Sequence, residues 1–268
     1  FGMPRMGIAG AAEATVIGQI IAAILALVFN LKCNRELNIS MKGFRPNGHL
    51  IVQIYKVGAP SIVVQAIGSL MTYGMNLILA AFGSAQTVFG IYFKLQSFVF
   101  MPVFGLNNGM VPIIAYNYGA GHKDRVIKTI KHSVAYGVGI MFAGLLAMHI
   151  FPAQLMRMFD AEESLIAIGA PALETISLSF VFAGFCIVAG SVFQALGNGV
   201  YSMIVSVARQ MCVLLPVAKL LSLSGEVTLI WWAFPIAELA SVLLTSYFLV
   251  RIYRKVICHI GEPVVQDA

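Results

Sequence analysis

Three charged residues stand inside long apolar stretches of the sequence: Lys94, Glu174 and Glu238. They lie about 8, 9 and 11 residues into these stretches, which at ~1.5 Å per helical residue corresponds to depths of about 12, 14 and 17 Å. Charged groups within a membrane pair with one another or mark the route of an ion or substrate. We therefore predict one charged layer in which Lys94 pairs with Glu174 or Glu238, for a structural or a transport role.

Neutral polar side chains in the same stretches form a second group of candidates for the lining of a substrate pathway. They are Gln65, Tyr73, Asn76, Asn107, Asn108 and Gln194. Asn107 and Asn108 lie between Gly105 and Gly109, a GxxxG pair that allows close approach of a neighbouring backbone. Amides at such a place either contact substrate or hydrogen-bond to a neighbouring helix, and for these two we favour the interhelical bond.

Catalytic and metal chemistry find no support in the sequence. The five histidines lie near the ends of apolar stretches without metal-ligand spacing, which predicts no metal site. The four cysteines show no paired spacing, so we expect free thiols. HExxH, GxSxG and the phosphate-binding glycine loop are also missing. We expect neither an enzyme nor a cofactor, and an ion gradient as the energy source.

The elements that must position these residues are transmembrane helices. The chain is 59% hydrophobic and 10% charged with a mean hydropathy of +0.88, which favours a bilayer over a water-soluble core. Its net charge of +6 then suits lipid headgroups, and nucleic-acid binding is not expected. Since a span needs about 20 apolar residues, we predict an all-α polytopic protein with seven spans, several of them kinked by prolines such as Pro216. The predicted spans are 11–31, 50–82, 86–118, 126–151, 165–196, 202–223 and 227–253.

Basic residues predict the topology, because short cytoplasmic loops are enriched in lysine and arginine. Most of the 17 fall on one side, at Lys32, Arg35, Lys42, Arg45, Lys56, Lys123, Arg125, Lys128, Lys131, Arg209, Arg251, Arg254 and Lys255. Arg5, Lys94, Arg157 and Lys219 fall on the other side. We therefore predict a multi-pass protein of the cell membrane with a cytoplasmic carboxy terminus, and we expect further sequence upstream of Phe1.

Polarity along the chain predicts its organisation. The most polar stretch follows the first span and separates it from the six others. We expect residues 1–36 to hold the last helix of a preceding lobe and residues 37–49 to form a cytoplasmic linker. Residues 50–256 then form a six-helix lobe and residues 257–268 a cytoplasmic tail.

Four stretches resemble the multidrug and toxic compound extrusion (MATE) family of antiporters. Residues 10–19 (GAAEATVIGQ) resemble the beginning of the last helix of the family's amino-terminal lobe, and residues 102–121 (PVFGLNNGMVPIIAYNYGAG) resemble its eighth helix. Residues 193–198 (FQALGN) resemble the end of its tenth helix, and the spacing of Arg209 and Pro216 resembles its eleventh. The resemblance covers essentially the whole chain.

This resemblance implies a twelve-helix transporter of two lobes, of which the chain supplies the last helix of the first lobe and all of the second. Such transporters exchange drugs or other amphipathic or cationic organic compounds for protons or sodium. One departure is that no Asp or Glu lies between Tyr55 and Phe82, where one branch of the family carries a coupling acid. The resemblance then points to coupling through an acid on the missing amino-terminal lobe.

Two other functions stay open beside the antiporter. A flippase for lipid-linked precursors, from the same superfamily, predicts more basic residues in the cavity than Lys94 alone. A seven-helix receptor fits the predicted extracellular amino terminus but not the polar stretch after one span.

Overall fold

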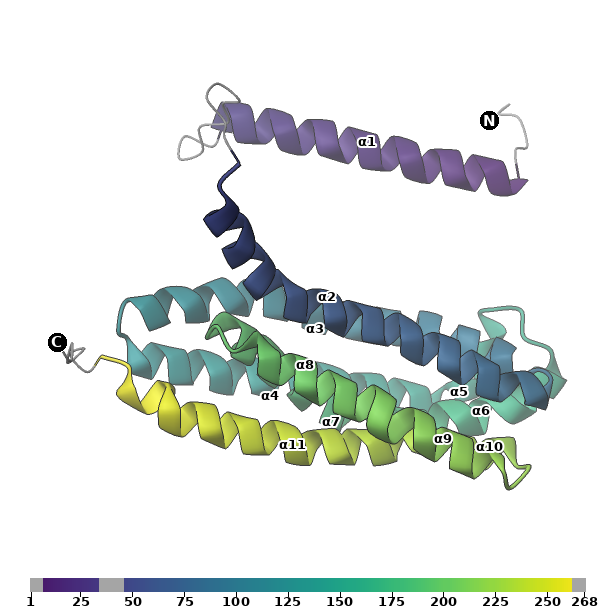
Figure 1. The fold of residues 1–268 in the computed structure, drawn as a ribbon. Coiled ribbons are helices and arrows are strands. Elements are labelled where there is room, and N and C mark those ends of the chain that lie inside the picture. The colour runs from purple at the N-terminus through teal and green to yellow at the C-terminus, as the bar shows by residue number, and fades with distance from the viewer. Residues whose placement is uncertain (1–6, 34–45, 262–268) are drawn as a thin grey trace. The chain divides into compact units, whose positions relative to one another are not determined.

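A computed structural model describes residues 7–33 and 46–261, which are helices joined by short turns (Figure 1). The prediction of an all-α protein is confirmed. The α-helices are α1 (Gly7–Cys33), α2 (Gly48–Leu79), α3 (Ala85–Gly119), α4 (Lys123–Ile150), α5 (Pro152–Arg157), α6 (Glu163–Ser177), α7 (Phe180–Ala195), α8 (Gly199–Val207), α9 (Leu215–Ser222), α10 (Val227–Ile230) and α11 (Ala233–Lys255). Three further helical turns are η1 (Ala80–Phe82), η2 (Ala208–Leu214) and η3 (Ile257–His259).

Six helical segments of the described residues are long and apolar enough to cross a membrane, and the bent pair α6 and α7 makes a seventh. The prediction of seven spans is confirmed. The fifth predicted span is broken, however, because α6 and α7 meet at 48°. The short helix α5, which precedes the broken span, was not predicted.

The chain divides into two compact units, Phe1–Ile51 and Val52–Ala268. The first unit contains α1 and the beginning of α2, and the second contains the remaining helices. Most of the predicted linker, residues 37–49, lies outside the described residues. The boundary between the units falls within the first turns of α2.

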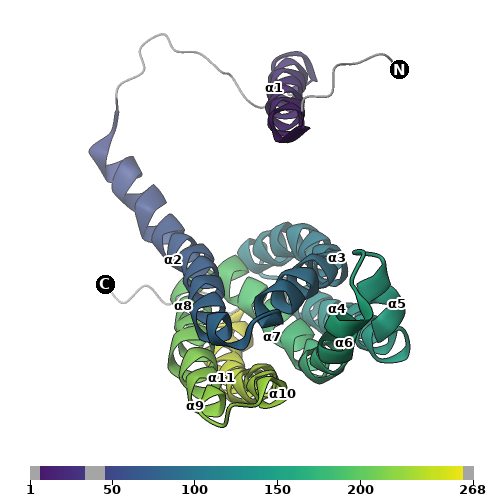
Figure 2. The same cartoon turned by 90° about the vertical axis from the view of Figure 1, so that its right-hand side faces the viewer.

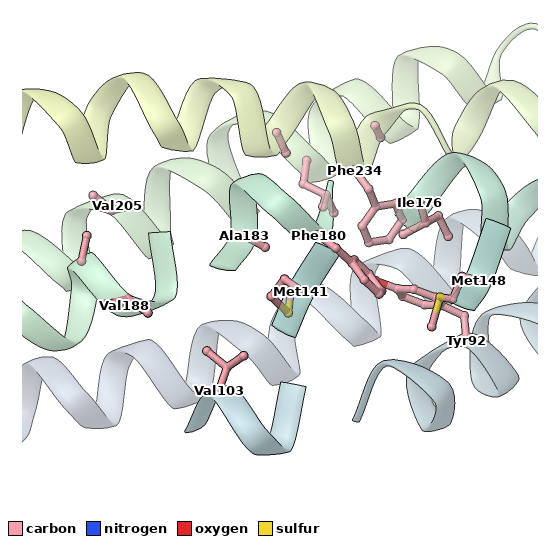
Figure 3. Packing of buried hydrophobic residues seen from close by; sticks show 14 of the residues in the cluster. Tyr92, Val103, Met141, Met148, Ile176, Phe180, Ala183, Val188, Val205 and Phe234 are labelled. Atoms are coloured by element: carbon pink, nitrogen blue, oxygen red, sulfur yellow. The ribbon is translucent and has the colours of Figure 1, made fainter. Parts of the chain in front are cut away.

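Helix α7 lies at the centre of the second unit. It packs against α3, α4 and α11, and α11 packs in turn against η2 (Figure 2). Large side chains from these helices converge, as the close view of Met141, Phe180 and Phe234 shows (Figure 3). The rings of Phe100 and Phe180 meet edge to face with centroids 5.3 Å apart. Because lipid tails are as apolar as these side chains, close packing is the main source of stability here.

Glycines bring α4 and α7 together. A Cβ atom at Gly184 would lie 2.8 Å from Met141 Cγ and 3.1 Å from the carbonyl oxygen of Gly137, so any other residue would force these neighbours to shift. The predicted GxxxG contact is wrong, because a Cβ atom at Gly105 or Gly109 would meet nothing within 4 Å. The close helix contact therefore uses glycines that do not form that motif.

Serine side chains satisfy the backbone at the break between α6 and α7. Ser179 Oγ donates to the carbonyl of Ile176 at 2.6 Å, and Ser177 Oγ donates to that of Glu174 at 3.0 Å. His149 Nδ1 lies 3.2 Å from Ser177 Oγ. The Ile176 carbonyl also accepts from the backbone N–H of Ser179 at 3.0 Å, so Ser179 Oγ adds a further bond to it. A helix can break within a membrane where contacts of this kind satisfy the backbone groups around the break.

The beginning of the predicted tail packs back onto the bundle. Ile257 and Ile260 are buried, and Lys123 Nζ donates to the carbonyl of Cys258 at 2.8 Å. Gly121 and Gly261 adopt positive φ and approach each other so closely that a Cβ atom at Gly261 would lie 2.9 Å from the Gly121 oxygen. This turn ties the end of α11 to the connection between α3 and α4.

Candidate functional site

A cavity of about 660 Å³ opens within the second unit. Residues of α2, α3, α7, α8, η2 and α11 line it. The lining combines aromatic rings and methionines with amides, hydroxyls and one pair of opposite charges. Its volume falls in the range of about 300 to 1,000 Å³ that drug-sized ligands occupy.

Helical spacing places the polar side chains on the cavity face of each helix. On α11, Glu238, Ser241 and Thr245 recur every three or four residues, which puts them on one face. From α8 into η2, Ser202, Ser206 and Arg209 are also three or four residues apart and line the cavity. The neighbouring Gln210 lines it as well. On α3 and α7 the corresponding residues include Gln96, Ser97, Asn107, Cys186, Ser191 and Gln194.

Arg209 and Glu238 form an ion pair across the cavity wall. Arg209 Nη1 donates to Glu238 Oε1 at 2.7 Å, and the side chains are 23% and 11% exposed. The other carboxylate oxygen, Glu238 Oε2, is buried without a hydrogen-bond partner among the described residues. These two residues carry the charges of the described cavity lining, so within it the charges balance.

A π-helical turn places Arg209. The helix changes from α to π at Ala208–Leu214, and the Leu215 amide donates to the carbonyl of Gln210, five residues earlier. Pro216, which follows, has no N–H to donate, so the preceding turn cannot complete a regular α-helical ladder. Such turns recur at functional sites because they shift the side chains on either side relative to each other.

Weaker polar contacts connect the helices around this pair. Cys186 Sγ on α7 accepts from Ser241 Oγ at 3.4 Å and lies 3.7 Å from Thr245 Oγ1 on α11. Ser202 Oγ on α8 donates to the carbonyl of Gly190 on α7 at 2.6 Å. These contacts hold α7 against α11, which carries Glu238, and against α8, which leads into the η2 turn that carries Arg209.

Four of the nine predicted site residues line the cavity: Gln65, Asn107, Gln194 and Glu238. Asn107 is 5% exposed, and its Oδ1 has no hydrogen-bond partner within the described part of the chain. The interhelical bond predicted for that oxygen is therefore not formed.

The other five predicted residues lie outside the cavity lining. Tyr73 and Asn108 are exposed on the surfaces of their helices, and Glu174 is half-buried. Asn76 donates to the carbonyl of Thr72 within its own helix, and its backbone carbonyl accepts from Gln86 Nε2 at 2.8 Å.

The predicted pairing of Lys94 is wrong. Glu238 pairs with Arg209, and Lys94 is exposed with its Nζ 5.7 Å from the centre of the Phe159 ring. In the described part of the chain, the salt bridges are Arg209–Glu238 and Arg157–Glu163. Depth along a helix axis, on which the predicted pairing rested, gives no information on the direction in which Lys94 points.

Arg209 was missed as a site residue because it was assigned to the basic cytoplasmic side. A signal in the sequence could have identified it, since Ser202, Ser206 and Arg209 follow one another at helical spacing within an apolar stretch. The predicted span 202–223 already contained Arg209.

Within residues 7–33 and 46–261, no group of three or more His, Cys, Asp or Glu side chains could hold a metal ion. The four cysteines are free thiols, as predicted. Of these, Cys186 lines the cavity.

The fold and the cavity define a polytopic α-helical membrane protein with a mixed polar and apolar cavity inside a helix bundle. The MatE family model matches residues 60–220, more than half of the 268 residues, and the chain belongs to this family. The resemblance noted in the sequence is thereby confirmed.

Named relatives are longer than this chain. It is 26% identical over 257 residues to the multidrug export protein MepA of Staphylococcus haemolyticus (strain JCSC1435), covering 95% of this chain and 56% of that protein. MepA of Staphylococcus aureus (strain N315) is 26% identical over 235 residues, covering 87% and 51% respectively. The structure of the MATE multidrug transporter DinF-BH, solved as a complex, superposes with a TM-score of 0.81 at 33% identity, over 92% of this chain and 56% of that one. The chain thus spans about half the length of these relatives.

Proposed function

We propose that this chain is the carboxy-terminal part of a secondary transporter that exports amphipathic or cationic organic compounds across the cell membrane. The cavity carries the proposal, because it has the volume and the mixture of aromatic, methionine and amide groups that bind drug-sized molecules. The relatives support it as well, since MepA is named for multidrug export and DinF-BH is named as a multidrug transporter.

A second lobe completes the transporter in this proposal. The relatives are about twice as long as this chain. The second unit of the chain forms one helix bundle, and α1 belongs to the first unit. Alternating access requires one bundle to rock against another around a site between them. We infer that α1 ends the first lobe and that α2 to α11 form the second.

Exchange against protons or sodium is the coupling that we propose. The Arg209–Glu238 pair supports it, because charged groups within the spans mark ion or substrate routes. The flippase is less well supported, since Arg209 is the basic residue of the described lining and it is already paired with Glu238.

Dye efflux from cells tests this function. We expect the longer protein that contains this chain to lower the accumulation of a cationic rhodamine dye in a strain without its own exporters, and an ionophore that collapses the ion gradients to abolish the effect. Residues 1–268 expressed alone should not export the dye. Efflux by that chain alone would contradict the two-lobe proposal, and no efflux by the longer protein would contradict the function itself.

A further inference from the structure

Arg209 keeps N–H donors that the ion pair with Glu238 does not use. Arg209 Nη1 is engaged with Glu238, but Nε and Nη2 have no hydrogen-bond partner among the described residues. The Arg209 side chain is 23% exposed and lines the cavity. Since a guanidinium carries five N–H donors, donors remain for a ligand.

The carboxylate of Glu238 also lines the cavity, but it is less accessible than Arg209, with side chains 11% and 23% exposed. One oxygen of Glu238 accepts from Arg209, and the other, Oε2, is buried. A cationic ligand would have to displace Arg209 before it reached this carboxylate. An anionic oxygen can bind to the free donors of Arg209 without breaking the ion pair.

The surroundings suit the body of such a ligand. Phe93, Phe100 and Phe104 line the cavity along α3, and Met71 lines it from α2. Aromatic rings and methionine pack well against flat apolar groups. An anionic group at Arg209 would therefore lie beside an apolar surface within the same cavity.

We infer that the Arg209 guanidinium is a subsite for a carboxylate or another anionic oxygen, and that the ligands include amphipathic compounds which carry one. The inference rests on the proposed transport function for its biological meaning. It deepens that proposal, because it names the residue of this cavity that would hold an anionic oxygen of the ligand.

A matched pair of dyes tests this subsite. Rhodamine B has a free carboxylate, whereas its ethyl ester has the same xanthene body without that charge. Binding of each dye to the longer protein in nanodiscs is measured by fluorescence anisotropy. We expect rhodamine B to bind about tenfold more tightly, because a charge-assisted hydrogen bond contributes on that order. Equal binding, or tighter binding of the ester, would overturn the inference.

Substitutions connect the preference to Arg209. Arg209→Gln should abolish the preference for rhodamine B, while Lys219→Gln, which removes an exposed lysine from the same span, should keep it. Because Arg209→Gln leaves Glu238 unpaired, the double variant Arg209→Gln with Glu238→Gln provides a neutral alternative that should fold and show no preference. A preference that survives Arg209→Gln, alone or in the double variant, would contradict the assignment.

The outcome separates this inference from the transport function. Efflux of the ester without any binding preference would overturn the anionic subsite and leave export standing. A clear preference that depends on Arg209, without efflux of either dye, would support the subsite and contradict export.

Discussion

A buried charge and its partner must be removed together or kept together. Arg209 and Glu238 lie within the spans, 23% and 11% exposed, and each neutralises the other. Removing one partner of a buried pair leaves the other uncompensated, which is more destabilising than the loss of an exposed pair. This difference leads to a matched comparison within the same chain.

We predict that Glu238→Ala lowers the free energy of unfolding by about 3 to 5 kcal/mol. The control is Glu163→Ala, which removes the acid of the Arg157–Glu163 pair, at a similar distance of 2.9 Å but 59% and 77% exposed. That change should have an effect of less than about 1 kcal/mol. Unfolding in mixed micelles, titrated with a denaturing detergent, measures both. Equal effects of the two substitutions would contradict the buried pair.

Sequence reasoning found Glu238 as a site residue but not its partner Arg209, and the difference has a physical reason. Depth along a helix follows from counting residues, and this placed Glu238 well inside the bundle. The direction of a side chain depends on helix rotation, which is set by packing against helices distant in sequence. Arg209 and Glu238 are 29 residues apart, and the π-turn shifts the helical phase between Arg209 and the residues that follow it. The pairing could therefore not be read from spacing alone.

At the scale of helices, α4 and α7 depend on glycine where they meet. We predict that Gly184→Ala destabilises the protein by about 1 to 3 kcal/mol, since its Cβ would lie 2.8 Å from Met141 Cγ and 3.1 Å from the Gly137 oxygen. Gly109→Ala is the control, because its Cβ would meet nothing within 4 Å. That change should be neutral or stabilising by up to about 1 kcal/mol, through the higher helix propensity of alanine. The same unfolding titration measures both, and a harmless Gly184→Ala would contradict the need for glycine at this contact.

The break between α6 and α7 gives a second comparison. Ser179→Ala removes the buried bond to the Ile176 carbonyl, and we expect a loss of about 0.5 to 1.5 kcal/mol. Ser222→Ala removes a bond of the same spacing, to the Lys219 carbonyl at 2.7 Å, but at an exposed helix end where water replaces the hydroxyl. Thermal unfolding in detergent should therefore show a lower midpoint for Ser179→Ala alone. Equal midpoints would mean that the break does not need its serine.

At the scale of the whole molecule, the basic residues predict which side faces the cytoplasm. We predict that cysteines placed at positions 42, 123 and 254, in a protein without its four native cysteines, resist a membrane-impermeant maleimide in intact cells. Cysteines at positions 160 and 162, beside the short helix α5, should react rapidly. Labelling before and after permeabilisation measures the difference, and the reverse pattern would overturn the topology.

The architecture was predictable where apolar runs are long and uninterrupted. Each span is a local feature of about 20 residues, so hydropathy located all seven. The bend between α6 and α7 was not predicted, because it falls at Leu178 and not at Pro171, the proline inside α6. The serine contacts that stabilise it involve polar side chains which hydropathy counts only as weak interruptions.

The turn that joins Cys258 to Lys123 has a mechanical consequence. The contact between Gly121 and Gly261 and the hydrogen bond from Lys123 to the Cys258 carbonyl attach the carboxy-terminal end of α11 to the hairpin of α3 and α4. In the rocking motion that we propose for the complete transporter, the fastened helices would move together at this end, and any bending would occur elsewhere, for instance at the break between α6 and α7. A large protein fused directly after Gly261 would strain the contacts of Gly261 and Cys258, whereas a flexible spacer before the fused protein would leave these contacts in place.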